Sequence, residues 1–257
     1  MNLGPDSFYD GGRLRSSWDI IKHAGKLLDH GAEILDLGAA STRPGAPLIT
    51  AAMERMRLMP ALDMVVREFP DAILSIDTYH ADIAREAVDR GAHIINDISA
   101  GAFDPLMFDT IARLQVPYVI MHIKGKPENM QQNPVYADVV KEVAAFFAEK
   151  LFQLRKLGVH DIIIDPGFGF GKSLEDNYKL LNNLDYFRIF ELPLLAGVSR
   201  KSMINKVLGT SPQNALNGTT ILNTLALERG ARILRVHDAR EAVEAVKIVE
   251  MFKLQEG

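Results

Sequence analysis

The chain has 257 residues, of which 47% are hydrophobic and 24% are charged, and its formal net charge is -4. This length and composition fit one α/β barrel domain with a sizeable core, and the weakly acidic balance gives no electrostatic footprint for nucleic acid. The absence of cysteine excludes disulfides, thiolate metal sites and a thiol nucleophile. Because we find neither a signal peptide nor an apolar run long enough to cross a bilayer, we expect a cytoplasmic protein without a membrane or nucleic-acid partner.

Helical and strand patterns alternate along the chain after a first loop that runs to about residue 15, and a second long loop covers residues 39–47. Short apolar runs predict strands at residues 32–38, 72–77, 93–98, 116–122, 161–164, 192–198 and 231–236. Apolar residues at helical spacing predict helices at about 20–30, 50–68, 81–90, 105–114, 136–157, after 172, within 199–229 and at 238–252. Glycine ends the helix before three of the strands, at Gly31-Ala32, Gly91-Ala92 and Gly230-Ala231.

Seven strands are clear, and Met1-Asn2-Leu3 is interpreted as the tail of an eighth. Continuous apolar strands between helices indicate a parallel sheet that helices cover. Seven strands plus this remnant favour a closed (β/α)8 TIM barrel with a truncated first strand over an open doubly wound sheet. We therefore predict a single domain over residues 1–257. The pair Asp238 and Glu241 also predicts a capping box at the start of the last helix.

One stretch suggests a binding site: Asp165-Pro166-Gly167-Phe168-Gly169-Phe170-Gly171-Lys172. It places an acid at the carboxyl end of a strand, glycines that let the backbone approach a ligand, and two aromatic rings as flat apolar walls. A polar anchor beside an aromatic slot suits a planar heterocycle with exocyclic N–H groups. The same residues also fit an ordinary Asp-Pro-Gly turn with two core phenylalanines. Nucleotide-binding motifs are excluded, because Pro166 stands where a Walker loop needs glycine and the Rossmann spacing is not met.

Polar side chains recur where the predicted strands end. In a barrel that end forms the active-site face. Each residue alone also fits a helix N-cap, a solvated surface group or a satisfied core histidine, but their recurrence at one rim favours a site. They are Asn2, Asp36, Asp77, Asn96 with Asp97, His122, Asp165, Ser199 with Arg200 and Lys201, and Arg235 with His237.

These groups divide by chemistry. The acceptors and amides Asp77, Asn96 and Asp165 can read the edge of a heterocycle. The cations and donors that can hold phosphate are Arg43, Lys201, Arg235 and His237. The last two follow the final strand at a helix N-terminus, where phosphate sites recur in barrels. The pattern suggests a planar, nitrogen-rich substrate that carries a phosphate or diphosphate.

In order and spacing, these motifs resemble those of the dihydropteroate synthase family over nearly the whole chain. The matching segments are Pro5-Asp6-Ser7-Phe8, Ser41-Thr42-Arg43-Pro44-Gly45, Ser75-Ile76-Asp77-Thr78, Ile95-Asn96-Asp97-Ile98, Asp165 to Lys172, Ser199-Arg200-Lys201 and Arg235-Val236-His237. The resemblance implies a (β/α)8 barrel, commonly a homodimer. It also implies condensation of (7,8-dihydropterin-6-yl)methyl diphosphate with 4-aminobenzoate to 7,8-dihydropteroate and diphosphate in folate biosynthesis, with sulfonamides as inhibitors.

The resemblance also implies roles for particular residues. Asp77, Asn96, Asp165 and Lys201 would hold the pterin ring, and Asn2 would ligate Mg²⁺ on the diphosphate. The diphosphate itself would be bound by Arg43, Arg235 and His237. The aminobenzoate pocket would include Thr42, Arg43, Pro44, Phe170 and Ser202. The catalytic residues would be Asp77, Asp36 and Lys201, with the carboxylates stabilising a cation on the pterin methylene and no covalent enzyme nucleophile.

The chain departs from the family pattern at two further places: Gly4 stands where the family usually has threonine, and Ala39-Ala40 replaces a Gly-Glu-like pair. Two alternatives therefore stay open. A pterin-dependent methyltransferase domain shares the barrel, but the segments 41–45 and 199–201 fit the synthase better. A non-catalytic pterin-binding protein would retain the binding residues without turnover.

Overall fold

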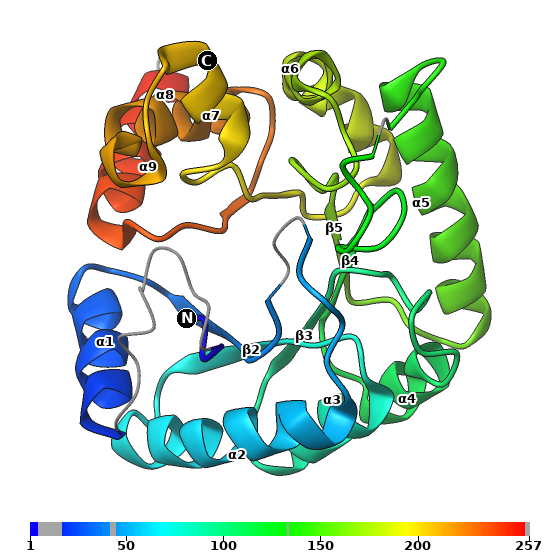
Figure 1. The fold of residues 1–257 in the computed structure, drawn as a ribbon, viewed down its shortest axis with the longest axis vertical. Helices are drawn as coiled ribbons and strands as arrows, with labels where there is room; N and C mark the ends of the chain where they lie inside the picture. The colour runs from blue at the N-terminus through cyan, green and yellow to red at the C-terminus, as the bar shows by residue number, and fades with distance from the viewer. Residues whose placement is uncertain (5–16, 42–44, 133, 255–257) are drawn as a thin grey trace.

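The computed structural model describes residues 1–4, 17–41, 45–132 and 134–254. Its helices form an outer ring around the strands (Figure 1). Five strands make one parallel sheet in chain order: β1 (Ile34–Gly38), β2 (Ile73–Asp77), β3 (Ile94–Asp97), β4 (Tyr118–Met121) and β5 (Ile162–Asp165). A second parallel ladder pairs β6 (Leu195–Ala196) with β7 (Ile233–Leu234).

Two isolated bridges extend these ladders. Ile164 pairs in parallel with Leu194, directly before β6, so the second ladder continues the first. Asn2 pairs with Gly38 at the end of β1, and the Leu3 N–H donates to the Gly38 carbonyl at 2.8 Å. The strands therefore follow one another around the molecule in chain order, as in a barrel. This order confirms the seven predicted strands, and the bridge at Asn2 agrees with residues 1–3 as the tail of a further strand.

The helices and two 3₁₀ segments connect the strands. They are α1 (Ser17–Asp29), α2 (Ala51–Glu68), α3 (Ala81–Asp89), α4 (Met107–Leu114), α5 (Val139–Lys156), α6 (Leu174–Asn182), η1 (Leu184–Phe190), α7 (Ser202–Leu208), η2 (Pro212–Asn214), α8 (Leu216–Glu228) and α9 (Ala239–Lys253). Gly209 adopts a left-handed conformation that ends α7, and Pro212 starts η2, which explains why the region 199–229 is divided. None of the helices described is long and apolar enough to span a bilayer.

The last two strands are shorter than predicted. In each of the apolar runs 192–198 and 231–236, only two residues pair in the ladder between β6 and β7. Pro193 lacks the N–H that a ladder requires and contributes only its carbonyl, which accepts from the Ile164 N–H at 3.0 Å. The remaining residues of both runs connect the ladder to the loops at either end.

The predicted glycine turns occur between helix and strand at three places. Gly31, Gly91 and Gly230 have φ values of 87°, 106° and 101°, a region in which other residues are strained. The next residue then bonds back to the helix end, as when the Ala32 N–H donates to the Leu27 carbonyl at 3.0 Å. Such a bond satisfies a helix carbonyl that would otherwise lack a partner.

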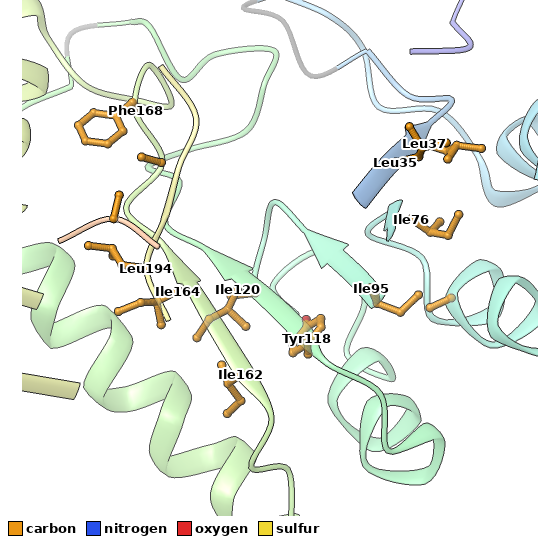
Figure 2. Close-up of a cluster of buried hydrophobic side chains, with 14 of the residues drawn as sticks. Leu35, Leu37, Ile76, Ile95, Tyr118, Ile120, Ile162, Ile164, Phe168 and Leu194 are labelled. Carbon is orange, nitrogen blue, oxygen red and sulfur yellow. The ribbon is translucent and has the colours of Figure 1, made fainter. Parts of the chain in front are cut away.

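Side chains alternate between the two faces of each strand. One set packs against the helices in the main core, part of which is shown in Figure 2, from Leu35 and Leu37 on β1 to Ile162 and Ile164 on β5. The alternate set forms a separate apolar cluster, which we take as the interior layer of the barrel. Its members are Ile34, Ile94, Val119, Ile163, Leu195 and Ile233.

The capping box predicted at Asp238 and Glu241 is wrong. Asp238 makes no side-chain cap to α9. Its carboxylate instead accepts two hydrogen bonds of 2.8 Å from Nε and Nη2 of Arg200, a pairing across 38 residues that local sequence does not reveal. A complete capping box begins α6, where the side chains of Ser173 and Asp176 each accept from the other's backbone N–H.

Glu54 on α2 is a carboxyl group with no exposed surface. Neither of its oxygens has a hydrogen-bond partner in the described structure, and His80 Nε2 lies 3.8 Å from Oε2. Burial raises the pKa of Glu54 to about 8. The nearby Thr78 hydroxyl opposes this rise, and the negative charges of Asp77 and Asp82 add to it. The folded protein therefore keeps Glu54 protonated at neutral pH, whereas the unfolded chain does not.

We expect Glu54→Gln to raise the free energy of unfolding by a few kcal/mol, at most about 5 kcal/mol, near pH 9 and to change it little near pH 4. The unfolded side chain loses its proton near its ordinary pKa of 4.5, but the folded one only near 8, so wild-type stability falls as pH rises between these values. The amide removes that loss. Urea unfolding across this pH range measures it, with the exposed Glu250→Gln as control. Parallel stability curves for wild type and Glu54→Gln would contradict the expectation.

Candidate active site

The inward-facing positions change from apolar to polar at the carboxyl ends of the strands. The polar residue lies two positions after an inward apolar residue, because side chains on one face of a strand recur every second residue. Asp36 follows Ile34 in this way, and Asn96 follows Ile94. The inward polar layer comprises Asp36, Ser75, Asp77, Asn96, Asp165 and Arg235, with Gly197 in the same layer on the segment after β6.

Asp36 is the centre of a hydrogen-bond network in this layer. The Ser75 hydroxyl donates to its Oδ1 at 2.7 Å, and the Asn96 amide lies 3.4 and 3.3 Å from its two oxygens. Arg235 Nε donates to Asp36 Oδ2 at 2.7 Å, and Arg235 Nη2 donates to Asp77 Oδ2 at 2.7 Å. One guanidinium therefore bridges two carboxylates from neighbouring strands.

Exposure separates the three charged groups. The Arg235 side chain is 42% exposed, compared with 17% for Asp36 and 9% for Asp77. The guanidinium is thus the member of the bridge that solvent, or an anionic ligand, reaches most easily. The carboxylates below it are held in place by their partners.

The two carboxylates differ in pKa. Burial acts to raise the pKa of Asp36, but the Arg235 charge and the Ser75 hydrogen bond outweigh it, so this pKa is lowered. Burial raises the pKa of Asp77 to about 7, with Arg235 opposing and the Asp36 charge adding. Asp36 therefore holds the firm negative charge of the pair, and Asp77 is the one that titrates near neutrality.

Asp165 and Lys201 face each other across the position of Gly197. Asp165 Oδ1 accepts from the Gly167 N–H at 2.8 Å. Burial raises the pKa of Asp165 against the opposing charge of Lys201, and burial lowers the pKa of Lys201 to about 8. A β-carbon on Gly197 would lie 3.7 Å from Lys201 Nζ and 4.0 Å from Asp165 Oδ2, so the glycine leaves the space between them open.

The glycine-rich loop after β5 uses its glycines in two ways. Gly167 and Gly171 allow close packing, because added β-carbons would meet the backbone oxygens of His122 and Lys124 at 2.0 and 2.3 Å. Among the described residues, an added β-carbon on Gly169 would meet only the Lys201 side chain, at 3.4 Å. Two glycines therefore make room for a neighbouring loop of the protein, and Gly169 is the one of the three that leaves space on the side of Lys201.

The two phenylalanines of this loop also differ. Phe168 is fully buried in the main core beneath the loop. Phe170 belongs to a second apolar cluster at the rim, and Lys201 Nζ lies 4.7 Å from the centroid of its ring. Only Phe170 is placed to serve as an aromatic wall.

The remaining predicted residues lie as follows. Asn2 Oδ1 accepts from the Gly4 N–H at 2.9 Å beside the end of β1, and His237 Nδ1 is 2.9 Å from the Ser199 hydroxyl. Ser202 is exposed at the first position of α7. Thr42, Arg43 and Pro44 lie outside the described residues, as do Pro5, Asp6, Ser7 and Phe8.

Three residues named at the strand ends lie outside the inward layer. Arg200 is the first, because its guanidinium pairs with Asp238 and donates to the carbonyls of Pro212 and Gln213. Asp97 follows Asn96 directly and therefore points to the opposite face, where it accepts from Tyr118 and from Ser99. His122 is buried beneath the glycine-rich loop, and burial lowers its pKa to about 2. Gly197 and Ser75 were not proposed as site residues. Counting every second residue from Leu195 and Asp77 would have found both.

Comparison with known proteins agrees with this geometry. A family model described as pterin binding enzyme matches residues 1–237. The dihydropteroate synthase of Escherichia coli strain K12 is 41% identical over 252 residues, covering 97% of this chain and 89% of the relative. That of Haemophilus influenzae is 39% identical over 250 residues, covering 96% and 90%.

Solved structures show the same likeness. The Yersinia pestis dihydropteroate synthase with a sulfonamide drug complex has a TM-score of 0.94 at 39% identity, covering 98% of this chain and 92% of that one. The Xanthomonas albilineans dihydropteroate synthase with 4-aminobenzoic acid has a TM-score of 0.90 at 38% identity, covering 98% and 90%. The chain belongs to the pterin-binding enzyme family. Within it, the relatives compared above are dihydropteroate synthases, and the likeness to their structures confirms the predicted (β/α)8 barrel.

Proposed function

We propose that this chain is a dihydropteroate synthase, which joins (7,8-dihydropterin-6-yl)methyl diphosphate to 4-aminobenzoate and releases 7,8-dihydropteroate and diphosphate. The observation that carries the proposal is the inward polar layer, which brings acceptors for a heterocycle next to a cation accessible from solvent. Relatives with this name that match nearly the whole chain, and the two ligand-bound neighbours, support the same reaction.

The inward layer suits recognition of the pterin. The Asp165 carboxylate would accept from the N–H groups at the edge of the ring, and the Asn96 amide and Asp77 would read the remaining edge. Lys201 would donate to a ring acceptor on the opposite side. The open position at Gly197 leaves room for the ring between Asp165 and Lys201.

The same layer suits departure of diphosphate. The bond between the pterin methylene carbon and the diphosphate oxygen breaks, and its electron pair leaves with the diphosphate, whose charge Arg235 and His237 would bind. The methylene cation that remains is delocalised into the ring and is stabilised by the negative charges of Asp36 and Asp77. The aniline nitrogen of 4-aminobenzoate then forms the new carbon–nitrogen bond and loses a proton. No step needs a covalent enzyme nucleophile.

Mg²⁺ would arrive with the diphosphate. Within the described residues no group of three or more His, Cys, Asp or Glu side chains is placed to hold a metal. Asn2 Oδ1 accepts one hydrogen bond from Gly4 and has a second lone pair for an ion. Since Mg²⁺ commonly keeps several waters and binds through substrate phosphates, one amide ligand fits it. When bound, the ion would neutralise charge on the leaving diphosphate.

The aminobenzoate would bind beside the rim cluster. Phe170 offers an aromatic wall and Ser202, at the start of α7, a hydroxyl and an N-terminal backbone N–H for the carboxylate. Thr42, Arg43 and Pro44 are proposed to complete this pocket on the strength of the family resemblance, with Arg43 also reaching the diphosphate.

A coupling assay tests the function. Purified protein is incubated with the pterin diphosphate, 4-aminobenzoate and Mg²⁺, and dihydropteroate is detected by mass. Product that is lost with a chelator and with a competing sulfonamide supports the proposal. Pterin binding without product would favour a non-catalytic pterin-binding protein, and methyl transfer from a methylated pterin would favour the methyltransferase alternative.

We also propose a cytoplasmic homodimer. Exposed apolar residues gather on η1, α7 and α8. The last two helices pack closely, since a β-carbon on Gly218 of α8 would lie 2.9 Å from Leu208 of α7. Ile221 and Leu225 recur at helical spacing from Gly218 and continue this apolar stripe, which a second copy would cover.

Leu225→Glu is expected to convert the dimer into monomers, because a charge in an apolar interface loses its hydration without gaining a partner. Light scattering after size exclusion measures the mass. Ile248→Glu on α9 is the control, because this residue is also apolar and exposed, at 69% against 46% for Leu225, but lies off this stripe. A monomeric wild type, or an unchanged mass for Leu225→Glu, would contradict the dimer.

A further inference from the structure

Lys172 is a second lysine at the glycine-rich loop, and the reaction described above does not use it. Its side chain is buried, with 2% of its surface exposed. Its ammonium donates to the Gly167 carbonyl at 2.8 Å, to the Phe170 carbonyl at 3.1 Å and to His122 Nδ1 at 3.0 Å. The His122 carbonyl lies 3.3 Å away. The loop therefore folds around this ammonium, and all of its nearest partners are neutral acceptors.

Lys201 holds the same loop from the other side. Its ammonium donates to the Phe168 carbonyl at 2.5 Å, whereas the carbonyls of Gly167 and Phe170 turn to Lys172. The positive φ values of Gly167 and Gly169, 72° and 80°, permit this reversal of successive carbonyls. The strip of backbone between the two lysines is thus fixed from both faces.

Burying the Lys172 ammonium costs desolvation free energy. Burial lowers the pKa of Lys172 to about 7, and the Asp165 charge is the main opposing effect. No salt bridge within the described residues pairs Lys172 with a carboxylate. An apolar side chain of similar length would avoid the desolvation but would remove the donor from the carbonyls of Gly167, Phe170 and His122 and from the histidine nitrogen.

We propose, on the basis of the proposed function, that Lys172 is a positioning residue for both substrates. By holding the carbonyls of residues 167 and 170, it orients the carbonyl of Phe168 and the ring of Phe170. The Phe168 carbonyl places the Lys201 ammonium beside the pterin, and the Phe170 ring forms the wall of the aminobenzoate pocket. Lys172 therefore acts through Lys201 and the loop, without contact with either substrate.

A double-mutant cycle tests this dependence. Lys172→Met is expected to raise KM for both substrates by roughly tenfold, because both half-sites lose their alignment. Adding Lys172→Met to Lys201→Met should then cost less than about threefold further in pterin affinity, since residues that act through one another are not additive. The matched control is Lys179→Met on α6, a lysine whose side chain is 49% exposed and which should leave both constants unchanged.

A purely structural lysine would give a different result. In that case Lys172→Met would lower the thermal midpoint while the folded fraction kept wild-type KM values, and this outcome would overturn the proposal. Losses that simply multiply in the double variant would also overturn it. If Lys172→Met does not fold, Lys172→Gln decides in its place, because the amide can still donate to two carbonyls while removing the charge and the third bond.

The readouts separate this inference from the proposed function. Pterin diphosphate affinity is measured by calorimetry and turnover by the coupling assay. A wild type that binds pterin without turnover would refute the synthase function, and the cycle in affinity would still test Lys172. If the wild type turns over but the losses of the two single variants multiply in the double variant, the role of Lys172 alone would be refuted. A wild type that neither binds nor turns over would refute both.

Discussion

Arg235→Gln is expected to lower kcat/KM for the pterin diphosphate by roughly 10²- to 10³-fold. The guanidinium bridges Asp36 and Asp77 with two bonds of 2.7 Å, so its loss removes a diphosphate donor and leaves two neighbouring carboxylates without their shared cation. Steady-state kinetics with both substrates measure the effect. Arg240→Gln is the control, a change on the surface of α9 at an arginine whose one ion pair among the described residues is with Glu244.

The same variant makes a prediction about pH. Arg235 opposes the rise in the pKa of Asp77, which stands at about 7, so without the guanidinium this pKa rises further. If the reaction needs ionised Asp77, the acid limb of the pH–rate profile moves to higher pH. Arg235→Lys should not restore the wild-type profile, because one ammonium lacks the fork that reaches two carboxylates. A kcat/KM within twofold of wild type, or an unmoved acid limb, would remove Arg235 from its assigned role.

Asp165→Asn is expected to weaken binding of the pterin diphosphate by roughly 10²-fold while the protein stays folded. The Gly167 N–H donates to the Asp165 carboxylate at 2.8 Å, and the amide oxygen of the variant can still accept this bond, so the loop keeps its hydrogen bond to residue 165. On the substrate side, however, the new NH₂ group faces the N–H donors of the pterin, so neither the amide nor the pterin has an acceptor for its hydrogens. Asp161→Asn, an exposed residue just before the same strand, is the matched control.

Asp165 also sustains the charge on Lys201. Burial lowers the pKa of Lys201 to about 8 against the opposing attraction of Asp165, so removal of the carboxylate lowers this pKa further. Residual pterin binding by Asp165→Asn should therefore weaken as pH rises through neutrality. Calorimetry at several pH values tests both statements, and wild-type affinity at any of them would exclude Asp165 from pterin recognition.

The sequence was informative where chemistry and strand periodicity coincide. Apolar runs that end in Asp36, Asp77, Asn96 and Asp165 predicted both the barrel and the rim, and the structure brings these residues together in one layer. A polar residue at a strand end is not enough, however. Asn96 and Asp97 are adjacent and face opposite ways, so only the strand parity decides which one belongs to the site.

Long-range pairings limited the rest of the prediction. Asp238 has the sequence context of a helix cap, but Arg200 takes its carboxylate from a distance of 38 residues. Lys172 stands in the sequence as the end of a glycine-rich loop, and nothing local indicates that its ammonium turns inward to four acceptors. Phe168 and Phe170 have similar neighbours in sequence, yet one enters the core and the other the rim.

The alternation of inward and helix-facing residues has a consequence for changes in chain length. Inserting or deleting one residue within β2 or β5 would exchange its two faces, turning Asp77 or Asp165 toward the helices and an isoleucine into the polar layer. A change of one residue in the loops beyond the strand ends leaves the faces as they are. Length variation that preserves activity should therefore be confined to the loops, so the register of the strands acts as a reading frame for the active site.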